Sequence, residues 1–168
     1  FQKHTADIPF PFTEIDADQW LSGIINLSPE KDGKINLVIR NDDNELIGEV
    51  GALDLVVNEQ AEIGYWLAKP YWGQGIMTNV VRRFCQFAFE EFQLQRLYGK
   101  VFATNLRSAA VLTKVGFRHE GTLRKGYFRN GQPVDVDRNA AGCRRHLPDR
   151  RLHSARTPSG KAVKRPCN

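Results

Sequence analysis

The stretch EIGYWLAKPYWGQGI, residues 62–76, joins a short apolar pattern to a loop that contains two glycines. Residues 62–67 are largely apolar, which predicts a strand in the interior of a sheet. Gly73 and Gly75 follow, and apolar residues then recur at helical spacing over residues 78–92. A strand, a glycine loop and a helix in this order are typical of phosphate-binding sites, because glycine lets backbone N–H groups approach an anion and a helix N-terminus carries partial positive charge.

The glycine loop does not match two common nucleotide-binding motifs. It is not followed by the Gly-Lys-Ser/Thr of a Walker loop, and the third glycine of a dinucleotide fingerprint would fall on Thr78. Taken alone, Gly73 and Gly75 also fit a plain tight turn. The role of the loop therefore has to be inferred from the elements that surround it.

The elements on either side of the loop predict one mixed sheet. Apolar periodicity and turn residues indicate, in chain order, a helix over 13–25, a hairpin over 35–56, a strand over 97–102, a helix over 105–114 ended by Gly116, and a second hairpin that begins at Glu120 and turns at Asn130-Gly131. Hairpins that flank strand–helix–strand–helix units favour the α/β (α+β) class, with a mixed central sheet flanked by helices.

Length and charge predict one domain followed by a basic tail. The 168 residues are 41% hydrophobic and 26% charged, which is ordinary for a globular domain. Residues 1–137 carry 15 Lys and Arg against 18 Asp and Glu, a net charge of −3, whereas residues 138–168 carry nine against one, a net charge of +8. Because residues 138–168 contain no Phe, Tyr, Trp or Ile, we expect them to be disordered and the last strand to be truncated.

Both ends of the chain raise expectations about its origin. The chain begins with Phe1 rather than Met, so its N-terminus is expected to be incomplete. The basic tail is interpreted either as a product of a reading-frame shift or wrong splice, or as an arm that binds acidic partners such as nucleic acid. No apolar run approaches the ~20 residues of a spanning helix, so no membrane segment is expected. Three cysteines without a CxxC or a zinc-type cluster indicate free thiols in a reducing, cytoplasmic compartment, and no metal.

Five motifs give the chain a family resemblance. They are EIGYWL (62–67), PYWGQGI (70–76), NLRS (105–108), VLTKVGF (111–117) and EGTLR (120–124). In this order and spacing they closely resemble the GNAT superfamily of acetyl-CoA-dependent N-acetyltransferases, and within it the ribosomal-protein N-terminal (Rim-type) branch. The resemblance covers about residues 7–137 and is most specific over 62–124.

The resemblance implies an acetyl-CoA site around the glycine loop. The loop backbone would hold the pyrophosphate, with contributions from Tyr71, Trp72, Gly73, Gln74, Gly75 and Ile76. The residues after Leu67 would part from the strand over 97–102 and admit the pantetheine arm between the strands, with Leu67 and Ala68 contributing to the site. Asn105 matches the asparagine that contacts this arm.

The resemblance also implies how the leaving group is treated. Ser108 matches the branch's serine, which is proposed to stabilise the leaving thiolate. Many members of the superfamily place a tyrosine acid where this chain has Leu112, so the acid role passes to Ser108 or to water. Asn105 and Ser108 also fit a simpler role as caps of the predicted helix.

Acetyl transfer to an amine requires a group that accepts a proton. Amines are mostly protonated at neutral pH, with reference pKa values of ~8 for an α-amine and ~10.4 for lysine. Glu62, at the start of the strand beside the glycine loop, is the first candidate for this catalytic base, with Glu120 and Glu49 in reserve. A backbone N–H near Ala68 is expected to steady the carbonyl oxygen. Glu62 also fits a solvated charge at a strand end.

Two classes of function remain open from the sequence. The first is an enzyme that moves acetyl from acetyl-CoA to a protein N-terminus or a small amine, acting as a monomer or homodimer. The second is a non-catalytic module that binds acyl-CoA, or that associates with nucleic acid or the ribosome through the basic tail. The sequence does not identify the acceptor.

Overall fold

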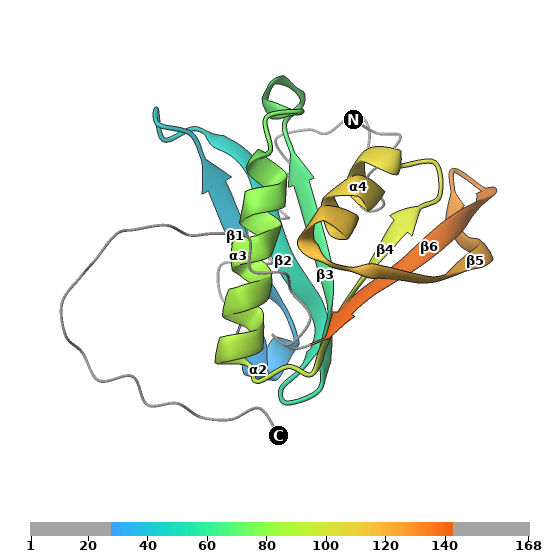
Figure 1. Cartoon of the computed structure of the whole chain (residues 1–168), viewed down its shortest axis with the longest axis horizontal. Coiled ribbons are helices and arrows are strands. Elements are labelled where there is room, and N and C mark those ends of the chain that lie inside the picture. Colours follow the sequence, from blue (N-terminus) through green and yellow to red (C-terminus); the bar gives the residue numbers. More distant parts are fainter. Residues whose placement is uncertain (1–27, 143–168) are drawn as a thin grey trace.

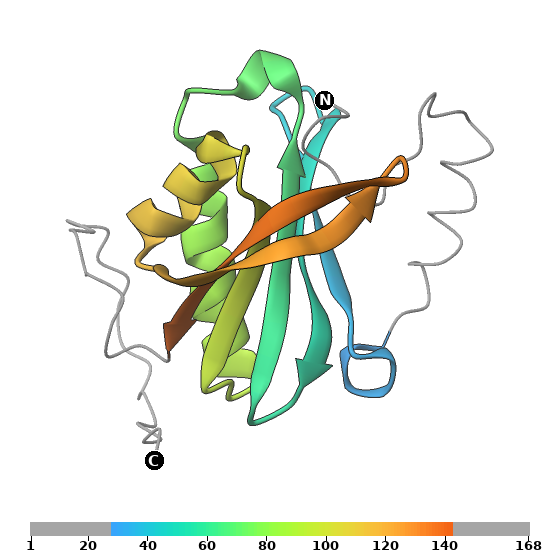
Figure 2. The ribbon, with the colours of Figure 1, turned by 90° about the vertical axis from the view of Figure 1, so that its right-hand side faces the viewer.

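Six strands form one sheet in the order β1-β2-β3-β4-β6-β5 in the computed structural model, which describes residues 28–142. The elements in chain order are α2 (Pro29–Asp32), β1 (Ile35–Arg40), β2 (Leu46–Val56), β3 (Gln60–Leu67), a 3-10 turn (Lys69–Tyr71), α3 (Ile76–Glu91), β4 (Arg96–Phe102), α4 (Leu106–Val115), β5 (Arg118–Arg129) and β6 (Gln132–Gly142). The helices α3 and α4 lie side by side on one face of the sheet (Figures 1 and 2). The predicted α+β class with a mixed central sheet is confirmed.

The sheet is mixed because of one pair of strands. The strands β3 and β4 are parallel, and every other neighbouring pair is antiparallel. A parallel connection needs a crossover, and α3 supplies it between β3 and β4. The hairpins predicted over 35–56 and around Asn130-Gly131 are both present, as β1–β2 and β5–β6.

The strands β3 and β4 separate soon after they meet. Their register contains only three pairs, Gln60 with Arg96, Ala61 with Leu97, and Glu62 with Tyr98. Beyond these pairs β3 continues beside β2, and β4 continues beside β6, which leaves a V-shaped opening between them (Figure 1). The sequence predicted that the strands part after Leu67, and they part five residues earlier.

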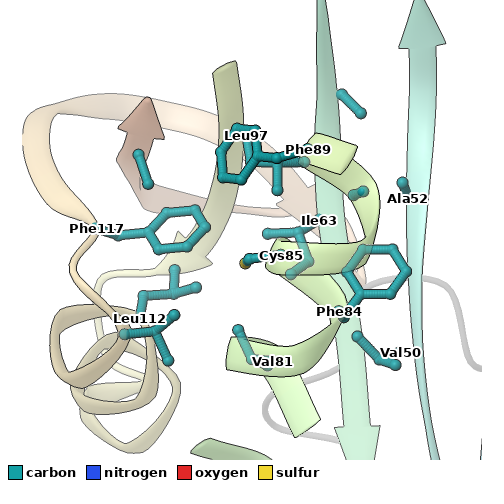
Figure 3. Close-up of a cluster of buried hydrophobic side chains, with 14 of the residues drawn as sticks. Val50, Ala52, Ile63, Val81, Phe84, Cys85, Phe89, Leu97, Leu112 and Phe117 are labelled. Carbon is teal, nitrogen blue, oxygen red and sulfur yellow. The ribbon is translucent and has the colours of Figure 1, made fainter. Parts of the chain in front are cut away.

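The hydrophobic core fills the space between the sheet and the two helices. One face of α3 packs on β2 and β3, while α4 covers β4 (Figure 3). Gly99 allows the close approach of α4, because a Cβ there would lie 3.2 Å from side-chain atoms of both Ile63 and Leu112. The labelled members of this core are Val50, Ala52, Ile63, Val81, Phe84, Cys85, Phe89, Leu97, Leu112 and Phe117.

The last strand is longer than the sequence predicted. We expected regular structure to stop near residue 137, but β6 continues to Gly142, and Asn139, Ala140 and Ala141 are buried. The boundary at 137 was wrong because β6 lies between β4 and β5: its residues 138–140 pair with both strands and 141–142 with β4, so backbone pairing continues the strand without an apolar side-chain pattern. Residues 143–168 of the predicted tail, and the helix predicted over 13–25, lie outside the described residues.

No helix within residues 28–142 is both long enough and apolar enough to cross a membrane.

Truncation tests the new end of the domain. We expect a chain ended after Gly142 to unfold at nearly the same urea concentration as the full chain. A chain ended after Asp137 loses the pairing of 138–142 with β4 and three buried residues, so we expect its free energy of unfolding to fall by ~3 kcal/mol or more. Equal unfolding midpoints for the two truncated chains would show that the end of β6 does not stabilise the domain.

Candidate functional site

The glycine loop presents backbone groups at the start of a long helix. Gly73 and Gly75 both have φ of 79°, a left-handed conformation that favours glycine. A Cβ added at either position would meet nothing within 4 Å, so the loop faces open space. Gly75 is the N-cap of the 16-residue α3, where no side chain caps the helix and no acidic residue lies in the first turn. The first N–H groups of α3 are therefore suited to bind an anion.

Three side-chain hydrogen bonds hold this loop in place. The indole N–H of Trp72 donates to the carbonyl oxygen of Leu67 at 2.7 Å, and the amide of Gln74 donates to the carbonyl of Pro70 at 3.2 Å. The amide of Asn41 donates to the hydroxyl of Tyr71 at 3.1 Å. These contacts tie the loop to the end of β3 and to the β1–β2 turn.

A cation lies beside the loop. The guanidinium of Arg107, in the first turn of α4, lies 5.0 Å from the ring centre of Trp72. This cation–π contact joins α4 to the glycine loop and adds positive charge near the N-terminus of α3. The positive charge of Arg107 and the uncapped N-terminus of α3 both favour a negatively charged ligand at the loop.

The backbone of β3 points donors into the V-shaped opening. Ala68 itself donates its N–H to the carbonyl oxygen of Ile47 at 2.8 Å, so the N–H expected near Ala68 to steady a substrate carbonyl would belong to a neighbouring residue of β3. Successive residues of an antiparallel strand direct their N–H groups to opposite sides. The N–H groups of Tyr65 and Leu67 therefore face away from β2, toward the opening.

Asn105 and Ser108 meet at the start of α4. Asn105 is the N-cap, and its side-chain oxygen accepts the backbone N–H of Ser108 at 3.2 Å, so the predicted capping role is present. The Ser108 hydroxyl oxygen lies 2.9 Å from the hydroxyl oxygen of Tyr65, which belongs to the separated part of β3. Leu112, one turn further along α4, is buried in the core.

The carboxylates lie on the opposite face of the sheet. The side chain of Glu62 is 15% exposed and lies 2.6 Å from the ammonium of Lys100. This hydrogen bond raises the pKa of Lys100, which keeps the lysine cationic. Glu62 is also the last β3 residue paired with β4, so it stands at the vertex of the opening.

The two reserve carboxylates have different partners. Glu120 pairs with Arg96, whose Nη1 lies 2.6 Å from one carboxylate oxygen, and this hydrogen bond lowers the pKa of Glu120. Glu49 is 7% exposed and accepts hydrogen bonds from the amide of Asn36 and, at 3.1 Å, from the indole of Trp66. Glu49 is thus buried among neutral donors, whereas Glu120 is held by a cation.

An open position lies between Glu62 and Trp66 on this face. Gly64 shares the face with both, because alternate residues of a strand point the same way. A Cβ at Gly64 would meet nothing within 4 Å. The face therefore has free space beside the Glu62 carboxylate, next to the opening between the strands.

The structure brings most of the predicted site residues to one opening, from two faces of the sheet. The loop residues 71–76 and the pair Asn105 and Ser108 lie with the helices, and Glu62 lies behind them across the sheet. The sequence did not identify the partners Tyr65 and Lys100, because each meets its predicted site residue only through the fold. No group of three His, Cys, Asp or Glu in the described part of the chain could hold a metal ion.

Comparisons with known proteins agree with this geometry. Residues 1–118 match the acetyltransferase (GNAT) domain. The uncharacterized N-acetyltransferase YoaA of Bacillus subtilis is 35% identical over 99 residues, which are 58% of this chain and 56% of that protein. The ribosomal-protein-serine acetyltransferase of Escherichia coli is 30% identical over 129 residues, 76% of this chain and 71% of that protein.

A solved structure has the same fold. The structure of Mycobacterium smegmatis RimJ in complex with CoA-disulfide aligns with a TM-score of 0.74 and 25% identity, and covers 84% of this chain and 70% of that chain. The chain spans little more than half the length of the first curated relatives that it matches, between 52% and 58%. From the family match and the shared fold, we conclude that the chain belongs to the GNAT acetyltransferase family, and its relatives include the ribosomal-protein acetyltransferases expected from its motifs.

Proposed function

We propose that the protein transfers the acetyl group of acetyl-CoA to a primary amine. The observation that carries this proposal is the continuity between the open glycine loop and the V-shaped opening between β3 and β4. The loop suits the phosphates of the coenzyme, and the opening suits its extended arm. Family membership supports the same donor.

The donor side of the site needs only neutral and cationic groups. The backbone N–H groups of residues 71–76 would bind the pyrophosphate, aided by the N-terminus of α3. The N–H groups of Tyr65 and Leu67 would donate to the pantetheine arm, which would then take the place of the backbone partner that this part of β3 lacks. Asn105 would contact the same arm. One of these strand N–H groups, in place of Ala68, would stabilise the carbonyl oxygen as it gains negative charge.

The acceptor side needs a carboxylate. A protonated amine approaching Glu62 would find free space at Gly64 and negative charge at Glu62 and Glu49. Glu62 would accept a proton from the ammonium group before attack, directly or through water, and so free the nitrogen electron pair that forms the new bond. Lys100 holds the Glu62 carboxylate in position until the amine arrives.

The proposed reaction balances without a further reactant. The amine nitrogen forms a bond to the thioester carbonyl carbon, and the carbon–sulfur bond breaks with its electron pair on sulfur. The ammonium nitrogen loses two protons in all, one before attack and one as the amide forms; sulfur gains one proton, and the other is released to solvent. Ser108 would donate a hydrogen bond to the leaving thiolate. The acceptor class is a protein N-terminus or a small amine, and the ribosomal-protein acetyltransferases among the relatives make N-terminal peptides the first substrates to test.

The glycine loop is tested by filling its open space. We expect Gly75→Trp to remove acetyl-CoA binding in calorimetry, because the side chain would occupy the space in front of the α3 N-terminus. Gly131→Trp is the matched control, since Gly131 also has positive φ, of 73°, and open space around it, but lies in the β5–β6 turn. Binding that survives in Gly75→Trp would contradict the assignment of the loop.

Glutamine variants separate the three carboxylates. We expect Glu62→Gln to lower kcat about 100-fold with an N-terminal peptide, because the amide cannot take a proton. Glu120→Gln should leave kcat nearly unchanged, because Glu120 is bound by Arg96, which lies where β3 and β4 are still paired and not at the opening. A larger loss in Glu49→Gln than in Glu62→Gln would move the role of the base to Glu49.

Gly64→Ala tests the acceptor side alone. The added methyl group enters open space, so thermal stability should not change. We expect the KM of the amine to rise several-fold while the KM of acetyl-CoA stays the same, because the donor binds on the other face. An increase in the acetyl-CoA KM instead would place the donor, not the acceptor, at Gly64.

A further inference from the structure

Tyr65 is a partly buried titratable residue, and the proposed reaction uses only its backbone. Its hydroxyl lies 2.9 Å from the hydroxyl oxygen of Ser108 and donates to the Ser108 carbonyl oxygen at 3.1 Å. The two residues are 43 positions apart in the sequence. They connect the separated part of β3 to the first turn of α4, so the contact lies where the donor arm is expected.

The single phenol proton can serve either of two acceptors. When Tyr65 donates to the Ser108 carbonyl, the Ser108 hydroxyl is free to donate back to the phenol oxygen. When Tyr65 donates to the Ser108 hydroxyl oxygen, the serine proton has to point elsewhere. A small rotation of the phenol O–H bond exchanges these arrangements, because both acceptors belong to one residue.

The surroundings of Tyr65 keep the phenol neutral. Burial raises the pKa of Tyr65 well above its usual value, and the nearby Cys85 is also buried, with its pKa raised to about 12. Both groups therefore keep their protons at neutral pH. Tyr65 is thus a permanent hydrogen-bond donor and not an acid that gives up its proton.

Ser108 is fixed on its other side as well. Its backbone N–H is bound by the side chain of Asn105 at 3.2 Å, and α4 fixes its Cα. The hydroxyl rotor is the remaining freedom of the residue, and Tyr65 is the side chain that contacts it. Tyr65 therefore controls the direction in which the Ser108 proton points.

We propose that Tyr65 is a positioning residue, which directs the Ser108 hydroxyl toward the sulfur of the leaving coenzyme. The inference rests on the proposed function and deepens it. As the thiolate forms, Tyr65 donates to the Ser108 oxygen and Ser108 donates to sulfur, so two hydrogen bonds act in series. No proton leaves Tyr65, and no further reactant is needed.

Phenylalanine at position 65 removes only the hydroxyl group. Because the ring of Tyr65 packs against the core, Tyr65→Phe keeps this packing. We expect kcat to fall about tenfold with the KM of acetyl-CoA unchanged, since misdirection of one donor affects the transition state and not donor binding. In Ser108→Ala, adding Tyr65→Phe should cause no further loss.

Cys85→Ala is the packing control. Cys85 is buried on α3 near Tyr65 and is outside the proposed machinery, so this variant should lower thermal stability with kcat unchanged. If Tyr65 only ties β3 to α4 structurally, Tyr65→Phe would behave like this control, with lower thermal stability and unchanged kcat. That result would overturn the inference.

A spectroscopic measurement does not depend on turnover. Coenzyme A bound to the full chain is titrated with base, and the ultraviolet absorbance of its thiolate is followed. Donation from Ser108 should hold the pKa of the bound thiol below that of free coenzyme A in the same buffer, and Tyr65→Phe and Ser108→Ala should both raise it. An equal thiol pKa in wild type and Tyr65→Phe would also overturn the inference.

The two proposals fail in different ways. If wild type acetylates amines and Ser108→Ala is impaired but Tyr65→Phe is not, the role of Tyr65 is wrong and the proposed function stands. If wild type binds neither acetyl-CoA nor coenzyme A in calorimetry, the proposed function fails, and the role of Tyr65 fails with it.

Discussion

The separation of β3 and β4 is the constraint on which the site depends. Two strands that run parallel for only three residue pairs leave one edge of each strand without its usual backbone partner. Buried N–H and C=O groups without partners are costly, so this opening favours a ligand that supplies hydrogen bonds along an extended chain. The glycine loop, α4 and Glu62 all lie around the opening, and none of them would form a site if the strands stayed paired.

The fold maintains this separation through the packing of its helices. The crossover helix α3 starts at the open end of the V, so its N-terminus lies where a ligand would leave the sheet. Gly99 lets α4 approach β4 closely, and this position brings Ser108 within reach of Tyr65. The ladder between β4 and β6 then holds β4 away from the end of β3. Packing at a distance from the opening thereby sets its width.

Local patterns in the sequence predicted much of this fold, and their limits have physical causes. The apolar run at 62–67 and the glycines of the loop are local signals, so the strand and the loop could be placed. The end of β6 could not, because Ala140 is paired with both β4 and β5, and Ala141 with β4, and neither belongs to an apolar pattern in the sequence. Which N–H near Ala68 faces the opening could not be predicted, because the direction of an N–H depends on strand register.

The two faces of β3 differ in their chemistry: one carries carboxylates, and the other lies with hydroxyl and N–H donors. Glu62, Gly64 and Trp66 face one side, where carboxylates and free space suit a cationic amine. Ile63, Tyr65 and Leu67 face the other side, with the helices, where hydroxyl and N–H donors suit a phosphate and a thiolate. A strand alternates with a period of two residues, so a slip of one residue would exchange the two faces. The buried side chains of Ile63 and Leu67 oppose such a slip, because it would bring Glu62 into the core and expose them. The hydrophobic contacts that stabilise the fold therefore also determine which face of β3 carries Glu62 and which face carries Tyr65.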